Sequence, residues 1–366
     1  MSVRPTLGVW GPHPGQPSGV ASYIASSLPV LERMWHPMHA EHGTDPDQFD
    51  QVLYHLGNND LHHDAFQALA QRPGPVLLHE INILNYYYQA WERLPEHRQR
   101  QVLALLSTAL GTEIADGDAL EAFWRANPGI DPYSIDARIE TLVLDAATCV
   151  LVHHQRVAEL LKCAHPRARI EVIPFPVTPI TVTTDPDVRS RYGICPQTVV
   201  FGSFGYLGEY KRIEVLLAAW QAWAERPDDA LLLLVGAAQY AVSIPADASI
   251  RHIDHPDATD FTELLLSVDC AVQLRGPWLG ESSGPVSTLL AHHRSAILTD
   301  IPTFHPGRPR TNLTHIPVGG NEVELLTAAL EFHYRAPKAR PRFDPAFHWS
   351  AWAQRVTATL TDPRTR

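Results

Sequence analysis

Lysine is almost absent from this chain of 366 residues, and arginine carries most of the basic charge. The three lysines are Lys162, Lys211 and Lys338, so a lysine at a loop or a helix start needs a specific reason. Basic residues are also outnumbered, with 29 Lys and Arg against 40 Asp and Glu, for a formal net charge of −11. This balance disfavours nucleic acid or an anionic membrane surface as the main partner.

Cysteine and long apolar runs are scarce as well. The four cysteines contain no C-x-x-C pair, so the usual spacing of zinc and redox cysteines is missing. Scattered free thiols are typical of a reducing compartment. The apolar run at residues 230–235 is far shorter than the ~20 residues that span a bilayer. The N-terminus lacks the apolar stretch of a signal peptide. We therefore expect a cytoplasmic protein with no integral membrane association.

The acidic excess lies in the first part of the chain. Residues 1–150 hold 8 Lys and Arg against 18 Asp and Glu, a net of −10, whereas the remainder holds 21 against 22. Apolar residues make up 45% of the chain, which is enough for a packed core. At roughly 150 residues per domain, this length predicts two or three domains.

Short apolar runs alternate with helical patterns, which is typical of parallel sheets with crossover helices. In the first half, strands are predicted at residues 6–10, 51–55, 75–79, 148–153 and 169–173, with a mostly helical stretch over 90–145. A proline-rich segment at 174–196 is expected to be a linker. The pattern then restarts, with strands at 198–204, 231–235, 268–274 and 296–299. Helices are expected from residue 211 and over 285–293.

These patterns predict an α/β protein with two Rossmann-like, doubly wound domains that face each other across a cleft. The first would cover residues 1–178 and the second 179–344, with a helix within 345–366 packing back on the first. Open parallel sheets bind ligands at the carboxyl ends of their strands. Four loops at such ends are therefore candidates for ligand binding.

Two of these loops belong to the first domain. The loop around Ser18 and Gly19 joins a strand to a helix, where backbone N–H groups favour an anion, although an ordinary glycine turn has the same pattern. Its spacing matches neither G-x-G-x-x-G nor a P-loop. The other loop holds His79 and Glu80 at a strand end, with Asn82 close by. A histidine there can donate to a substrate hydroxyl or a leaving phosphate, or simply cap the strand.

The other two loops belong to the second domain. Lys211 and Arg212 stand at a helix start, where the helix dipole disfavours cations by about 0.3–1 kcal/mol, so an anionic ligand is expected there. Glu281 precedes Ser282, Ser283 and Gly284 at the start of another helix. Their N–H groups could receive a phosphate, and Glu281 could accept from two sugar hydroxyls. The alternative is a capped helix with Glu281 complementing its dipole.

Taken in order, these segments resemble the motifs of a retaining GT-B glycosyltransferase close to family 4, the glycosyl transferases of group 1. The segment SGVASY at residues 18–23 is similar to the acceptor-side glycine loop of that family. Residues 55–62 (HLGNNDLH), 73–74 (PG) and 78–80 (LHE) resemble the series H-x-G-N…H…P-G…L-H-D. Lys211 matches the family lysine on the donor diphosphate. Residues 274–275 and 280–284 (LR and GESSG) resemble the donor loop L-R-x-P-x-x-G-E-T-S-G.

The resemblance implies transfer of a hexose-type sugar from a nucleotide diphosphate to an acceptor hydroxyl, with retention. Catalytic roles would belong to His79, Lys211 and Glu281. The donor diphosphate and sugar would contact Gly19, Gly205, Lys211, Arg212, Glu281, Ser282, Ser283 and Gly284. The acceptor would lie near Ser18, Asn58, His62, Glu80, Asn82 and Tyr86.

The chain departs from the family pattern at four positions. Tyr206 stands where the family usually has an arginine, and Leu289 replaces the second glutamate of the E-x7-E motif. Arg294 replaces a glycine, and Glu80 replaces the aspartate of the H-D pair. The donor nucleotide and the sugar therefore do not follow from the resemblance.

Several alternatives remain open from the sequence. The chain could be another GT-B enzyme, such as a nucleotide-sugar epimerase or a pseudo-glycosyltransferase, or a degenerate binding or partner subunit. Its D-x-D pairs are interpreted as turns, so no metal site is predicted, nor any cofactor besides the donor. The acidic first domain favours a small soluble acceptor that is cationic, such as an amino sugar or aminocyclitol, although an acidic face can also serve solubility alone. The oligomeric state stays open, with a homodimer among the options.

Overall fold

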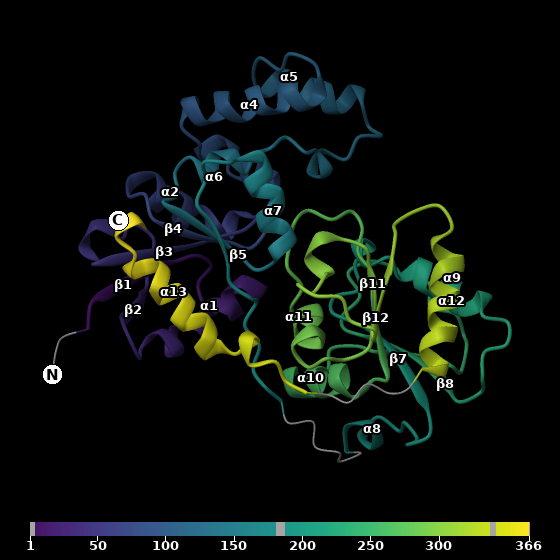
Figure 1. The fold of residues 1–366 in the computed structure, drawn as a ribbon. Coiled ribbons are helices and arrows are strands. Elements are labelled where there is room, and N and C mark those ends of the chain that lie inside the picture. The colour runs from purple at the N-terminus through teal and green to yellow at the C-terminus, as the bar shows by residue number, and fades with distance from the viewer. Residues whose placement is uncertain (1–3, 181–186, 337–341, 366) are drawn as a thin grey trace. The chain divides into compact units, whose positions relative to one another are not determined.

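The computed structural model describes residues 4–180, 187–336 and 342–365. The chain divides into two compact units, each built around a six-stranded parallel sheet (Figure 1). The first unit comprises Met1–Pro174, Leu279–Ser282 and Trp349–Arg366. The second comprises Phe175–Trp278 and Ser283–His348. The domain limits predicted at 178/179 and 344/345 stay predictions. Residues 181–186 of the expected linker lie outside the described residues.

The sheet of the first unit has the strand order β2-β1-β3-β4-β5-β6. Its strands are β1 (Thr6–Trp10), β2 (His36–His39), β3 (Gln51–Leu56), β4 (Pro75–Leu78), β5 (Cys149–Val152) and β6 (Ile170–Val172). Every residue of β3, β4 and β5 is buried, as expected for parallel strands covered on both faces. The crossover helices include α1 (Gly19–Leu31), α2 (His63–Gln71), α3 (Leu84–Gln89), α6 (Thr141–Leu144) and α7 (Gln155–Ala164).

A helical insertion separates β4 from β5. It contains η3 (Trp91–Arg93), α4 (Glu96–Leu110), α5 (Gly117–Ala126) and η4 (Pro132–Ser134). Figure 1 draws α4 and α5 beyond α6, away from β1 and β2. Gly111 ends α4 in the left-handed conformation, at φ 65°, and the Asp116 side chain accepts from the Ala119 N–H to cap α5.

The C-terminal helix α13 (Trp349–Thr361) belongs to the first unit. It packs against α1, where the Tyr23 ring lies 5.3 Å from Trp349 and 5.8 Å from Trp352 between ring centroids. Trp35 Nε1 donates to Thr357 Oγ1 at 3.0 Å. These contacts join the last helix to the first helix of the chain.

The sheet of the second unit has the order β12-β11-β10-β7-β8-β9. Its strands are β7 (Val199–Phe204), β8 (Ala230–Val235), β9 (Ile250–Ile253), β10 (Cys270–Gln273), β11 (Ala296–Thr299) and β12 (Leu313–Ile316). Helices α9 (Ile213–Ala222) and α12 (Glu322–Arg335) supply the core on one face of the sheet. Helices α8 (Asp187–Arg191), α10 (Ala258–Ser267) and α11 (Gly284–Ala291) supply it on the other. Both units are therefore doubly wound.

The nine strands predicted from apolar runs are confirmed to within two residues, whereas β2, β9 and β12 were missed. All three missed strands lie at the edge of a sheet. Strand β2 reads HPMH and has no buried residue, and its proline is compatible only with an edge position. The three missed strands bury at most two residues each, so they leave no apolar run in the sequence. Helix α8 also falls within the segment that was expected to be an irregular linker.

Candidate functional site

Histidines gather at the carboxyl ends of the central strands of the first unit. His55 lies in β3, His79 directly follows β4 and His153 directly follows β5. His55 Nδ1 and His79 Nε2 are 3.0 Å apart, and their rings stack at 20° with centroids separated by 5.3 Å. The ring of His153 lies 5.7 Å from that of His79. Parallel strands end at one edge, so they bring these rings together.

Burial governs the protonation of this cluster. It lowers the pKa of His55 to about 3 and that of His153 to about 4. The pKa of His79 is held well below its usual value, first by burial and then by the neighbouring His55, His153 and His62. These imidazoles are therefore neutral at pH 7, so His79 can exchange hydrogen bonds with a ligand but carries no positive charge to it.

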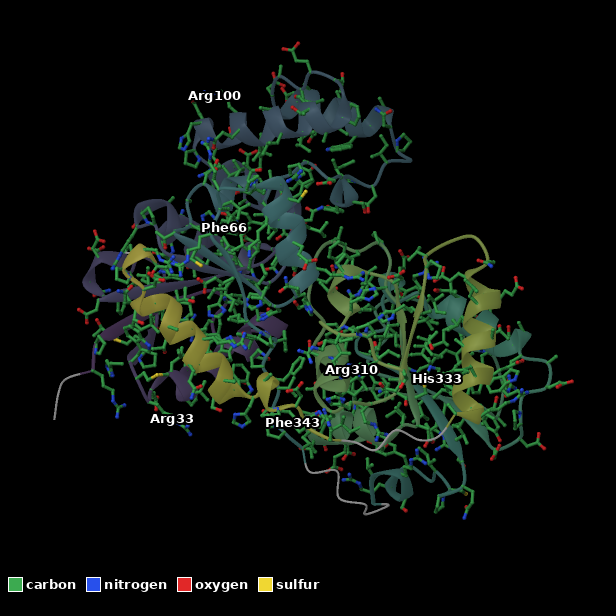
Figure 2. The ribbon with its side chains drawn as sticks, viewed as in Figure 1. Arg33, Phe66, Arg100, Arg310, His333 and Phe343 are labelled. Atoms are coloured by element: carbon green, nitrogen blue, oxygen red, sulfur yellow. The ribbon has the colours of Figure 1, made fainter. Side chains whose placement is uncertain are left out.

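Three residues predicted to lie beside an acceptor have partners within the first unit. His62 is 1% exposed and its Nδ1 donates to the His55 carbonyl at 2.8 Å, while burial lowers its pKa to about 4. Tyr86 is 2% exposed and stacks on Phe66 of α2 at 3.7 Å between ring centroids (Figure 2 labels Phe66). The Asn58 side-chain oxygen accepts from the Tyr86 N–H at 3.2 Å. His62 and Tyr86 are thus buried, and their contact with an acceptor stays a prediction.

The remaining predicted residues of the first unit lie at loop ends. Ser18 caps α1 by accepting from the Val20 N–H at 3.2 Å. Gly19 follows it as the first residue of α1, and a Cβ added there would meet no atom within 4 Å. Glu80 is half-buried beside His79. The space around Gly19 is therefore open to a ligand.

The segment Leu279–Ser282 groups by contacts with the first unit. The His79 carbonyl accepts from the Ser282 N–H at 3.4 Å, and Ser282 Oγ lies 3.1 Å from His154 Nε2. The carboxylate of Glu281 accepts from the Leu279 N–H at 2.8 Å. The structure thus brings together His79 and Ser282, which lie far apart in the sequence. His154 was missed, and its only sequence signal is that it also follows a buried strand.

A glycine shapes the entry to this segment. Gly280 adopts φ +88°, and a Cβ there would lie 2.6 Å from the Ile81 Cβ. The Asn82 N–H donates to the Leu279 carbonyl at 2.9 Å. Only glycine allows this approach of the two loops.

In the second unit, Lys211 lies at the carboxyl edge of β7 and β10. It is 5% exposed, and its Nζ donates to the Phe204 carbonyl at 2.8 Å and to Gln273 Oε1 at 2.9 Å. Gly205 has φ +106°, and a Cβ there would come within 3.3 Å of Lys211 Nζ. Gln273, the last residue of β10, was missed because one buried glutamine carries no pattern in the sequence.

Arg212 forms an ion pair within the second unit. Its guanidinium contacts the carboxylate of Glu322, which is itself buried, with Nε 3.1 Å from Oε1. Arg212 also adopts φ +51°, and a Cβ on Gly276 would lie 3.1 Å from its Cδ. The predicted contact of Arg212 with a diphosphate would have to compete with Glu322.

Searches of the sequence against protein-family models and against curated proteins find no match. The folded chain resembles solved structures. HepE from Anabaena, in complex with UDP, has a TM-score of 0.54 and 13% identity over 98% of this chain and 96% of that one. WaaG, a glycosyltransferase involved in lipopolysaccharide biosynthesis, has a TM-score of 0.51 and 11% identity over 98% of this chain and 96% of its own. Sucrose-phosphate synthase from Thermosynechococcus elongatus has a TM-score of 0.52 and 15% identity over 98% of this chain and 95% of its own.

The likeness covers nearly the whole of each chain. The chain has the GT-B fold. The predicted α/β class is thereby confirmed. Membership of family 4 and retention of configuration stay predictions.

In this GT-B fold, α11 explains one departure from the family motif. Ser283 caps the helix by accepting from the Val286 N–H at 3.4 Å, as the capped-helix alternative expects, and a Cβ on Gly284 would meet no atom within 4 Å. Leu289 is 0% exposed within the core that α10 and α11 share. A glutamate at Leu289 would bury a charge, which is costly without a partner.

A metal-ligand cluster and a membrane-spanning helix are both absent from the described residues. No group of three or more His, Cys, Asp or Glu side chains among them is placed to hold a metal ion. None of the helices that the structure describes is long and apolar enough to cross a membrane.

Proposed function

We propose that this protein is a retaining glycosyltransferase that moves a hexose-type sugar from a nucleotide diphosphate to a hydroxyl of a small, amine-bearing acceptor. The observation that carries the proposal is the buried ammonium of Lys211 at the carboxyl edge of the second sheet, where it donates to the Phe204 carbonyl and to Gln273 Oε1. Doubly wound sheets bind their ligands at this edge. A cation kept there despite its desolvation favours an anionic ligand such as a diphosphate.

The proposed roles follow from where charge develops. The leaving diphosphate gains negative charge in an oxocarbenium-like transition state, and the Lys211 ammonium stabilises it. The N–H groups at the start of α11, near Ser283 and Gly284, add donors for the same phosphate. A further part of the stabilisation comes from the α11 dipole.

The sugar would be held by residues of the first unit. Neutral His79 would exchange a hydrogen bond with a sugar hydroxyl, and the Glu281 carboxylate would accept from hydroxyl groups. The acceptor oxygen would attack from the face that the diphosphate leaves, and the departing phosphate would take its proton. This route needs no second carboxylate as a nucleophile.

Two further features belong to the proposal. We propose that turnover needs no metal and no cofactor besides the donor, and loss of activity in EDTA, restored by Mg²⁺ or Mn²⁺, would contradict this. We also place the protein in the cytoplasm, because its four cysteines are free, two of them exposed.

A donor panel followed by variants tests the proposal. Among UDP-, GDP-, ADP- and dTDP-sugars, the true donor at 100 times its Kd stabilises the protein by about 2.7 kcal/mol in thermal unfolding. Lys211→Met and Glu281→Gln are expected to abolish turnover while the fold survives. Lys162→Met, which removes an exposed lysine of α7, is the matched control and should leave turnover unchanged. Near-normal rates in both site variants would refute the assignment.

A second candidate, a degenerate GT-B binding subunit, is favoured by Tyr206. This residue is 59% exposed at the position where the family usually has an arginine. Slow donor hydrolysis in the absence of acceptor would count against the subunit. Product analysis with a labelled donor would also reveal an epimerase or a pseudo-glycosyltransferase.

A further inference from the structure

The insertion between β4 and β5 forms a cavity, open to solvent, that the proposed chemistry does not use. Its volume is 720 Å³, and its walls come from α3, η3, α5 and η4, all within residues 88–133 of the first unit. Sites for small ligands in proteins usually measure about 300–1,000 Å³. The cavity is therefore large enough for one or two sugar-sized rings.

Four aromatic side chains line this cavity: Tyr88, Trp91, Trp124 and Tyr133. The rings of Tyr88 and Tyr133 meet edge to face, with centroids 5.9 Å apart. The Tyr88 hydroxyl is buried and has no hydrogen-bond partner among the described residues. Gly117 lets Trp91 approach, since a Cβ there would lie 3.2 Å from Trp91 Nε1. Aromatic faces of this kind bind the C–H face of a sugar ring or an ammonium group.

Four carboxylates complete the lining: Glu92, Asp116, Asp118 and Glu121. The lining includes no lysine, arginine or histidine. Glu121 has an ion pair with Arg125, but both side chains are 75% exposed, so this pair offsets little of the charge. The cavity therefore combines aromatic faces with negative charge, which together select a cation.

We propose that this cavity is the acceptor site, and that the acceptor is a polyhydroxylated ring carrying a protonated amine, such as an amino sugar or aminocyclitol. The acceptor role rests on the proposed function, whereas the binding of the amine does not. The acidic excess of residues 1–150 supports the proposal, because 4 of its 18 carboxylates line this one cavity.

Asn82, in the segment that follows His79, forms hydrogen bonds with the walls of the cavity. The Asn82 side-chain amide donates to the Tyr133 carbonyl at 3.0 Å and to the Ile135 carbonyl at 3.2 Å. Its oxygen accepts from the Leu84 N–H at 3.0 Å, at the start of the helix that carries Tyr88. Asn82, predicted as an acceptor-side residue, thus holds two walls of the cavity and is a positioning residue.

Three sugars that share one ring but differ in charge test whether the cavity recognises the amine or only the ring. Calorimetry or ligand-observed NMR is run with glucosamine, N-acetylglucosamine and glucose. Glucosamine is expected to bind at least about tenfold more tightly than the other two, and less tightly at high salt. Equal binding of the three would overturn the proposal. Spermidine binding as tightly as glucosamine would overturn it too, because a merely acidic surface has no preference for a ring.

Variants then assign the binding to the cavity. Among the described residues, Glu92 and Asp118 are exposed and their side chains form no hydrogen bond or ion pair, so Glu92→Gln with Asp118→Asn should weaken glucosamine binding about tenfold at unchanged stability. Trp124→Ala is expected to weaken it comparably. Glu113→Gln with Asp136→Asn removes the same two charges from exposed residues outside the lining and is the matched control. Loss of affinity in the control, or none in the cavity variants, would contradict the proposal.

The donor panel distinguishes the two hypotheses. If the nucleotide sugar binds and glucosamine does not, the cavity proposal is wrong and the transferase proposal stands. If glucosamine binds in the cavity but no nucleotide sugar binds anywhere, the amine site stands and the transferase proposal fails. Cavity variants that keep donor binding and donor hydrolysis but lose transfer to glucosamine would support both.

Discussion

At the scale of single residues, the surroundings of Lys211 show how a glycine and a lysine depend on each other. Gly205 turns the chain at the end of β7 with φ +106°. A Cβ at this position would lie 3.3 Å from Lys211 Nζ, so glycine leaves room for the ammonium. The Lys211 Nζ can then reach both the Phe204 carbonyl and Gln273. Any side chain at Gly205 would strain the backbone and displace the charge.

Gly205→Ala is expected to lower the free energy of unfolding by about 1–3 kcal/mol, because alanine is strained at this φ. Donor binding should weaken as well, since Lys211 moves. Gly19→Ala is the matched control for stability: its Cβ would meet nothing, so the change should stay within about 0.5 kcal/mol. The measurements are urea unfolding and the thermal shift with donor. Equal stability losses in the two variants would contradict this account.

At the same scale, the sequence located some site residues and missed others. Lys211 was found because lysine is rare and this one stands at a helix start, and His79 because it ends an apolar run. Gln273 and His154 have no spacing that marks them, since their neighbours come from other strands and loops. Arg212 was assigned to the donor because it stands beside Lys211 at a helix start, and nothing in the sequence links it to Glu322, which lies 110 residues away.

At the scale of elements, α13 shows how the last helix stabilises the first unit. Trp352 is fully buried and packs against Tyr23 of α1. The sequence predicted a helix in this segment that packs back on the first domain, but only the fold shows which helix it meets.

Trp352→Ala should lower the free energy of unfolding by about 3–5 kcal/mol, because it removes a large buried side chain and leaves a cavity. Gln354→Ala, at an exposed position of the same helix, is the control and should change stability by less than about 0.5 kcal/mol. Chemical denaturation followed by circular dichroism measures both. A Trp352 variant as stable as the wild type would show that α13 is not part of the core.

At the scale of the whole molecule, the buried histidines link stability to pH. The pKa of His55 is lowered to about 3 and those of His62 and His153 to about 4, and the pKa of His79 is also well below its usual value. In the unfolded chain, histidine has a pKa of about 6.5. Below that pH the unfolded state binds more protons, so stability falls as the pH falls.

We expect stability to change little between pH 8 and 7, and to decrease between pH 6.5 and about 4.5 by up to about 1.4 kcal/mol per pH unit for each of these four histidines. Urea midpoints at half-unit intervals measure the slope. His153→Gln keeps a donor for the Ile173 carbonyl. It should lower the number of protons taken up on unfolding, which sets the slope, by about one. An unchanged midpoint from pH 7 to 5 would contradict the burial of the cluster.

The sequence alone determined the α/β class, nine of the twelve described strands and the carboxyl-end loops, because a buried parallel strand requires a run of apolar residues. It also determined the negative charge of the first 150 residues. Tertiary structure decided the rest. The edge strands needed partners rather than apolar residues, and the His79 cluster, the Lys211–Gln273 contact and the cavity of aromatic rings and carboxylates join residues from separate strands, helices and loops. Such contacts depend on distance in space, which spacing along the chain does not encode.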